Sequence, residues 1–201
     1  MNGYRKNSSI KCPLCGKRHT IPILYGMPSC EAFLEEEAGK IWLGGRKISV
    51  DSPSRYCKDC RKSFGKASES FRIIENVLFF VGGFNRDNHF IDISLASNSY
   101  ILTYRHLLPF NSKSDSTNSP IEQTKKLSVE EVKYLQGIIP KLYILEWPSS
   151  SIDSNILDGT QWSIEIKYQG KRKIKKHGSN KFPPYFTELV KAMSKLNGGQ
   201  L

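Results

Sequence analysis

The sequence CPLCG at residues 12–16 places two cysteines two residues apart, and YCKDC at residues 56–60 repeats that spacing. Two residues between thiols let one tight turn aim both sulfurs at a single tetrahedral ion, and Gly16 suits the left-handed conformation in which the chain leaves the turn. Cys12, Cys15, Cys57 and Cys60 are therefore predicted to bind one structural Zn²⁺ per chain. Because four thiolates close the coordination shell, this zinc would stabilise the fold and take no part in a reaction.

Two other side chains near these cysteines have competing interpretations. His19 is a rival ligand, although an exposed histidine is the interpretation we favour once four thiolates are present. Cys30 is the odd cysteine; a small packed side chain is favoured over a reactive thiol at a helix N-terminus. CxxC pairs with an odd cysteine count indicate metal binding in a reducing compartment, so a cytoplasmic location is expected.

The segment between the two pairs carries signals for a strand, a helix and a hairpin. Residues 20–25 fit a strand, and Ser29 can cap a helix that runs through Glu37. Residues 41–43 and 46–50 flank Gly44-Gly45, which favours a hairpin. Residues 1–66 are therefore predicted to form a zinc-ribbon-like module with a strand–helix–hairpin insert.

Short motifs in this module are similar to those of known proteins. CPLCG, ILYGMP, LGGRK and SPSRYCKDC, in this order, resemble the amino-terminal segment of small uncharacterised bacterial proteins with the pattern CPxCG, YGxP, LGG and CxxC. The resemblance covers residues 12–60, about a quarter of the chain, and implies a metal-binding module without an assigned activity. A cysteine often follows the two glycines in that pattern; here the residue is Arg46.

Residues 67–201 are predicted to form a second, α+β domain. The expected linker covers residues 63–70, and strands are expected at 71–81, 89–95, 100–106, 161–168 and 171–177. A capping box at Ser128 and Glu131 begins one helix, and Pro183-Pro184 begins another. Residues 111–126 are expected to be a loop, as are residues 148–155, and 142–147 a further short strand. The domain would be an antiparallel sheet of about five strands covered by two helices.

The carboxy-terminal part of the chain also carries a resemblance. DGTQWSIEI and GSNKFPPYF resemble the DGxxW strand and the GxNxxP helix start of small uncharacterised bacterial proteins. The matching positions are Asp158, Gly159, Trp162, Gly178, Asn180 and Pro183. The resemblance implies a common fold and no particular chemistry.

Basic charge suggests a polyanionic partner. The formal net charge is +11, and one stretch, residues 166–187, contains seven basic residues and no acid. On a hairpin, alternate lysines would share a face and could track the phosphates of a nucleic acid. An edge hairpin protected by lysine against aggregation is an equally good interpretation. The candidate nucleic-acid contacts are Lys167, Lys171, Arg172, Lys173, Lys175, Lys176 and Lys181.

Catalytic signals are weak. Asp158, Glu165 and Lys167 resemble the acidic–acidic–lysine site of Mg²⁺-dependent nucleases, but ExK on a strand is common by chance. His89, His106, Asp87 and Asp92 fall on adjacent expected strands, where ordinary surface pairs are favoured. No segment reaches the roughly 20 apolar residues of a membrane span, and no small-molecule cofactor motif occurs. A non-enzymatic binding or adaptor protein that contacts nucleic acid or another protein is expected; a nuclease and a protein-interaction module with incidental charge are the alternatives.

Overall fold

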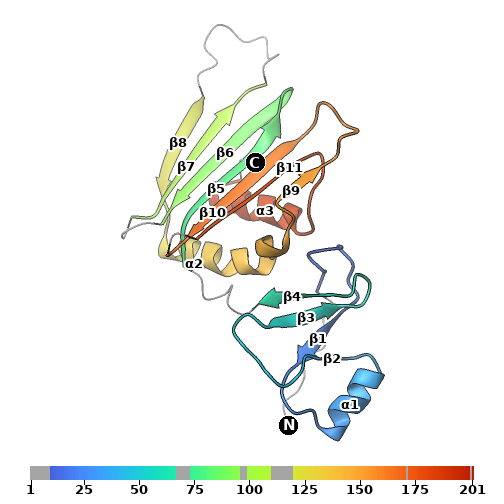
Figure 1. Ribbon diagram of the computed structural model, residues 1–201. Helices are drawn as coiled ribbons and strands as arrows, with labels where there is room; N and C mark the ends of the chain where they lie inside the picture. Colours follow the sequence, from blue (N-terminus) through green and yellow to red (C-terminus); the bar gives the residue numbers. More distant parts are fainter. Residues whose placement is uncertain (1–9, 67–72, 96–98, 110–119, 171, 200) are drawn as a thin grey trace. The chain divides into compact units, whose positions relative to one another are not determined.

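The computed structural model describes residues 10–66, 73–95, 99–109, 120–170, 172–199 and 201 (Figure 1). The chain divides into two compact units, Met1–Phe71 and Arg72–Leu201. The boundary expected from the sequence, after residue 66, lies five residues earlier. No helix in the described ranges is both long and apolar enough to cross a membrane.

The first unit contains a small four-stranded sheet and one helix. Its elements are β1 (Thr20–Leu24), α1 (Cys30–Glu37), β2 (Trp42–Leu43), β3 (Pro53–Cys57) and β4 (Lys62–Lys66). The strand order is β2-β1-β3-β4. Ser29 caps α1 by accepting a hydrogen bond from the amide of Ala32, which confirms the predicted start of the helix. A zinc-ribbon class for this unit remains a prediction.

The expected hairpin around Gly44-Gly45 is wrong. β2 pairs in parallel with β1, and no strand is assigned to the described residues 46–50. Gly44 serves close packing: a Cβ there would lie 2.4 Å from the ring of Tyr25 and 2.6 Å from Ile23. Gly45 has a φ of +86°, which glycine adopts without strain. The two glycines therefore bring β2 beside β1 instead of reversing the chain.

The second unit is built on a seven-stranded sheet in the order β8-β7-β6-β5-β10-β11-β9 (Figure 1). Its strands are β5 (Ile74–Gly83), β6 (Arg86–Ser94), β7 (Ile101–Leu107), β8 (Ile121–Lys126), β9 (Ser150–Ile152), β10 (Gln161–Tyr168) and β11 (Lys173–Ser179). All neighbouring pairs are antiparallel except β9 and β11, which are parallel. The α+β class is as predicted, but the sheet is larger than the expected five strands and is mixed.

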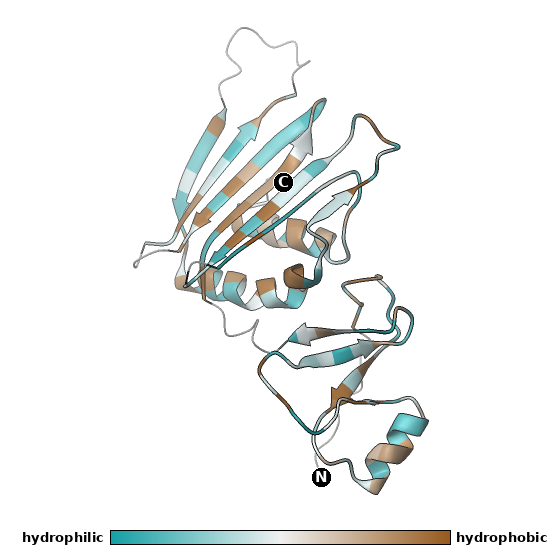
Figure 2. Cartoon of the chain, viewed as in Figure 1, coloured by the Kyte–Doolittle hydropathy of each residue, from teal (hydrophilic) through white to brown (hydrophobic). Residues whose placement is uncertain are grey.

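Helices cover one face of this sheet. α2 (Val129–Ile138), two 3₁₀ turns (η2, Ile139–Leu142, and η3, Ile144–Glu146) and α3 (Phe186–Leu196) contribute to the same hydrophobic core as the inward side chains of the strands. Along β10, Trp162, Ile164, Ile166 and Tyr168 are buried, and the residues between them face outward. Figure 1 shows α3 behind the sheet, and Figure 2 shows hydrophobic and hydrophilic residues alternating along β10. The other face of the sheet carries no helix among the described residues.

Four further expectations need correction, three of them in this unit and one at the end of the first unit. Residues 142–147 form 3₁₀ turns instead of a strand, and β9 lies within the expected loop 148–155. The expected loop 111–126 ends in β8, while residues 110–119 lie outside the described residues. Similarly, β4 occupies part of the expected linker 63–70, whose residues 67–70 are not described. In the segments that form β4, β8 and β9, backbone pairing with a neighbouring strand orders residues that were expected to be loop or linker.

Candidate metal centre and sheet surface

The four predicted cysteine ligands of the first unit lie together. The sulfurs of Cys12, Cys15, Cys57 and Cys60 are all within 4.8 Å of one another. The Cys12 and Cys60 Sγ atoms are 3.7 Å apart, and those of Cys15 and Cys57 are 3.6 Å apart. Pairing of β1 with β3 places Thr20 opposite Cys57, which brings the first knuckle to the second. This tetrad could hold a metal ion.

Both knuckles use the same local geometry. The Gly16 amide donates to the Cys12 carbonyl at 2.9 Å, and Gly16 has a φ of +76°, as predicted. In the second knuckle the corresponding residue after Cys60 is Arg61, with a φ of +55°. Backbone amides of Leu14 and Cys15 donate to the Cys12 sulfur, and those of Asp59 and Cys60 donate to the Cys57 sulfur. Such turns offset part of the negative charge that four thiolates would bring together.

Burial and hydrogen bonding shift the pKa values of Cys12, Cys57 and Cys60. Burial raises the pKa of the Cys12 thiol to about 12, and burial likewise raises the pKa of Cys60. Burial also acts to raise the pKa of Cys57, but hydrogen bonds from backbone amides and from neighbouring thiols outweigh it, so the pKa of Cys57 is lowered. A metal ion must displace these protons, because only thiolates bind it.

Two other residues of the first unit lie outside the tetrad. The His19 side chain is 63% exposed and its Nδ1 is 3.6 Å from Asp59, so the structure gives it no place among the ligand atoms. Cys30 is exposed at the first position of α1, which contradicts the expectation of a packed side chain.

The uncovered face of the large sheet carries a row of aromatic and basic side chains. Strand register places Arg105, Phe90, Phe80, Ser163 and His177 opposite one another across β7, β6, β5, β10 and β11. We call this set the aromatic row. The rings of Phe80 and Phe90 are 4.7 Å apart, and the Arg105 guanidinium lies 5.7 Å from the centre of the Phe90 ring. Both rings remain partly exposed.

A groove runs beside the aromatic row. Its volume is about 340 Å³, and its walls include Leu78, Phe80 and Phe90 together with Arg105 and Lys175. Two carboxylates, Asp92 and Glu165, also line it. The Asn76 amide donates to Asp92 at 2.7 Å, and the Lys173 ammonium is 2.6 Å from Glu165. Within the described residues, no ion pair engages Arg105 or Lys175. The groove therefore combines apolar walls with two cations not used in ion pairs there.

The predicted basic residues do not form one surface. Lys173 and Lys175 on β11 and Lys167 on β10 all point to the uncovered face. Lys167 forms an ion pair with Glu75 at 2.9 Å. Lys176 points to the helix-covered side and is only 8% exposed. Arg172 and Lys181 are exposed, and Lys171 lies outside the described residues. Lys176 cannot contact a ligand on the open sheet.

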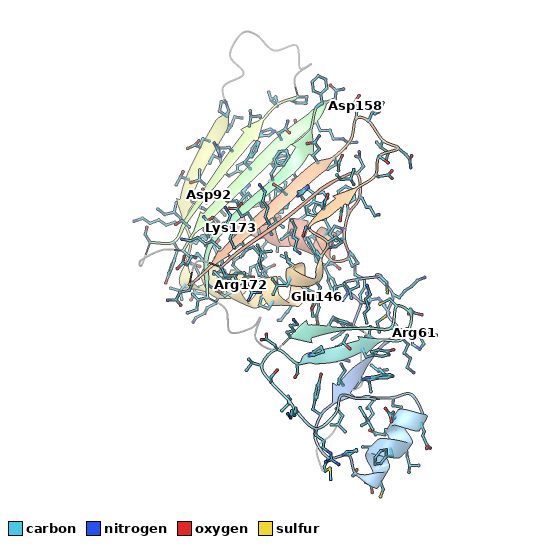
Figure 3. The ribbon with its side chains drawn as sticks, viewed as in Figure 1. Arg61, Asp92, Glu146, Asp158, Arg172 and Lys173 are labelled. Carbon is cyan, nitrogen blue, oxygen red and sulfur yellow. The ribbon has the colours of Figure 1, made fainter. Side chains whose placement is uncertain are left out.

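The nuclease-like residues are spread along the sheet. Gly159 lies beside Gly83 at the end of β5, which places its neighbour Asp158 at that end of the sheet. Glu165 pairs with Leu78, five residues along β5 from Gly83, or roughly 16 Å at ~3.3 Å per residue. Figure 3 shows Asp158 and Lys173, the partner of Glu165, well apart. Lys167 pairs with Glu75 instead of Glu165. The three residues do not converge.

Sequence reasoning missed Phe80, Phe90 and Arg105 as surface residues. A signal for Phe80 is present in the stretch 77–81, where both faces of β5 carry large apolar residues although helices cover only one. Among the other candidates, His89 and His106 face the helix-covered side beside Asp87, while Asp92 points to the opposite face.

Comparison of the chain with family models, curated proteins and solved structures finds no match.

Proposed function

We propose that this chain is a zinc-stabilised, non-enzymatic protein that binds single-stranded nucleic acid through the open face of its large sheet. The observation that carries the proposal is the aromatic row, in which two adjacent, partly exposed phenylalanines lie between Arg105 and His177. Open antiparallel sheets that bind single strands use such rings to stack bases, and nearby cations to contact phosphates.

Zinc is the metal that suits the cysteine tetrad. A tetrahedral ion with zinc–sulfur bonds of ~2.3 Å requires sulfurs about 3.75 Å apart. The sulfurs of Cys12 and Cys60 are 3.7 Å apart, and those of Cys15 and Cys57 are 3.6 Å apart. Four soft thiolate ligands favour Zn²⁺ over the oxygen-seeking ions. With all four positions taken, the ion would hold the first unit together, and its role in nucleic-acid binding would be indirect.

Stacking, more than charge, would supply the affinity. The open face carries basic side chains, but Lys167 and Lys173 are engaged with Glu75 and Glu165. Arg105 and Lys175 are the groove cations outside these ion pairs. Two phosphate contacts on a single strand predict a slope of about −1.4 for the logarithm of the binding constant against the logarithm of salt concentration. Binding should therefore weaken with salt only moderately.

The test is fluorescence anisotropy of labelled single-stranded RNA and DNA with the full chain. Phe80→Ala and Phe90→Ala should each weaken binding about five-fold to one-hundred-fold, because each stacked base contributes about 1–3 kcal/mol. Phe182→Ala is the matched control, since Phe182 is 47% exposed and packs against Phe186 of α3. Arg105→Gln, which removes one of the two groove cations, should also weaken binding, and Lys191→Gln on α3 is its control.

Two outcomes would reject this function. One is the absence of binding at 50 mM salt, which would favour a protein ligand for the same apolar groove. The other is equal affinity in Phe80→Ala, Phe90→Ala and the control variants. Cleavage of the strand in the presence of Mg²⁺, abolished by Glu165→Ala, would instead support the nuclease alternative.

A further inference from the structure

A second cluster of metal-ligating side chains lies at one end of the large sheet, away from the open face. Asp87, His89 and His106 each offer a ligand atom within 4.8 Å of the others. His89 on β6 is directly opposite His106 on β7, and Asp87 precedes His89 by two residues on the same strand. Strand register therefore fixes the three residues together.

One polar atom of this cluster lacks a hydrogen bond. Nε2 of His106 is buried and has no hydrogen-bond partner among the described residues. The nearest carboxylate oxygen, Oδ2 of Asp87, is 3.6 Å away, which is too long for a hydrogen bond. A buried polar group without a hydrogen-bond partner costs about 1–3 kcal/mol, and coordination of an ion is one way to satisfy it.

The other histidine is held by a neighbour. Nδ1 of His89 is hydrogen-bonded to the Tyr104 hydroxyl at 2.8 Å. Metal-binding histidines commonly use one ring nitrogen for such a contact, and the contact orients the second nitrogen toward the ion. With Nδ1 engaged, Nε2 is the nitrogen of His89 that remains for a ligand.

Space for further ligands is present beside the cluster. A cavity of about 520 Å³ is lined by Asp87 and His89, and by Arg86, Thr160 and Val190. Three protein ligands leave at least one coordination position open, in contrast to the closed tetrad of cysteines. The cavity can supply that position with water or a small anionic ligand.

We propose that Asp87, His89 and His106 bind a divalent transition-metal ion with an exchangeable position that faces this cavity. Two imidazoles and one carboxylate suit Zn²⁺, Fe²⁺ or Ni²⁺. The two rings are stacked, with 3° between their planes, so a shared ion requires the His106 ring to turn about its Cβ–Cγ bond while Tyr104 holds the His89 ring. This torsion is soft, and the Asp87 side chain is 50% exposed and therefore mobile enough to follow.

The experiment measures zinc and cobalt binding to the full chain. After loading and removal of loosely held ions, wild type should hold about two Zn²⁺, and Asp87→Asn and His106→Gln should hold about one. Co²⁺ separates the sites, because the cysteine tetrad gives a thiolate-to-cobalt charge-transfer band and the histidine site does not. Asp87→Asn and His106→Gln should keep the charge-transfer band and lose only the cobalt absorption that comes from the histidine site.

Matched controls make the result decisive. His177→Ala removes an exposed histidine from β11, and Asp92→Asn removes a carboxylate from the opposite face of the sheet; both should keep two ions. Circular dichroism of the metal-free variants checks that the sheet is intact. A wild-type protein that holds one ion, or an equal loss in the control variants, would overturn the proposal.

Discussion

Lys176 shows how much depends on a single residue in an alternating strand. It lies between exposed Lys175 and exposed His177 on β11, but its own side chain enters the helix-covered side. There its ammonium donates hydrogen bonds to the carbonyls of Leu145 and Trp147, at the end of the 3₁₀ turns. Burial lowers the pKa of Lys176, and the nearby Glu146 carboxylate opposes that shift.

Replacement of Lys176 by methionine tests this burial. Between the lowered pKa in the folded state and about 10.5 in the unfolded chain, the unfolded state binds more protons. Lys176 therefore makes the free energy of unfolding rise with pH through this window, and Lys176→Met should remove that contribution. Urea unfolding at several pH values up to 10.5 measures it. Lys175→Met should retain the wild-type slope, and equal slopes in all three proteins would contradict the prediction.

The predictability of individual residues follows from how far apart their partners are in the chain. Cys12 and Cys15 share a turn, so their spacing alone indicated a common ion, and the second pair repeated it. Phe80, Phe90 and Arg105 come from three strands, and only the register brings them into one row. A one-residue shift in pairing would send each side chain to the other face. The sequence carries no direct record of that register.

The start of α2 rests on one set of polar contacts. The Ser128 hydroxyl accepts from the Glu131 amide, and the Glu131 carboxylate accepts from the Ser128 amide and from Lys125. The hydrogen bond from Lys125 and that from the Ser128 amide lower the pKa of Glu131. This group therefore stabilises the fold above about pH 4.5, and the stabilisation is lost as the pH falls through the lowered value.

Glu131→Gln can keep the capping-box contact but loses the charge that pairs with Lys125, so it should reduce the free energy of unfolding by roughly 0.5 kcal/mol at pH 7. The difference from wild type should shrink in acid, once Glu131 is protonated in the folded protein. Glu130→Gln, one residue earlier and exposed, is the matched control and should have little effect at either pH. A constant difference between wild type and Glu131→Gln across the acid range would show that the carboxylate charge is not responsible.

Elements with a strong side-chain pattern were predicted, and those held by backbone pairing were not. β10 alternates buried and exposed residues along its length, and the α2 capping box is a local motif; both were found in the sequence. β8 is almost entirely exposed, and its backbone pairing with β7 makes it a strand. Hydropathy contains no signal for such an edge strand, because its hydrogen bonds depend on a neighbour elsewhere in the chain.

At the scale of the whole molecule, the two units would depend on different sources of stability if the cysteine tetrad holds zinc as proposed. The described part of the first unit has five buried apolar side chains, of which two are the cysteines Cys12 and Cys57. The second unit contains the large continuous hydrophobic cluster between its sheet and its helices. A structural zinc site contributes roughly 10–16 kcal/mol to the folding of a small module. A large hydrophobic core such as that of the second unit can stabilise a fold without a metal.

Chelation should therefore unfold the first unit and leave the second folded. Tryptophan fluorescence distinguishes them, because Trp42 stacks on Tyr56 in the first unit at 4.1 Å, while Trp147 and Trp162 are buried in the second. In the full chain, a chelator should change the Trp42 signal, and a Trp42→Phe variant should show almost no change. The same chelator saturated with zinc is the control. The prediction would be contradicted if chelation changed the fluorescence of Trp147 and Trp162, or left that of Trp42 unchanged. Either result would show that a metal ion does not selectively stabilise the first unit.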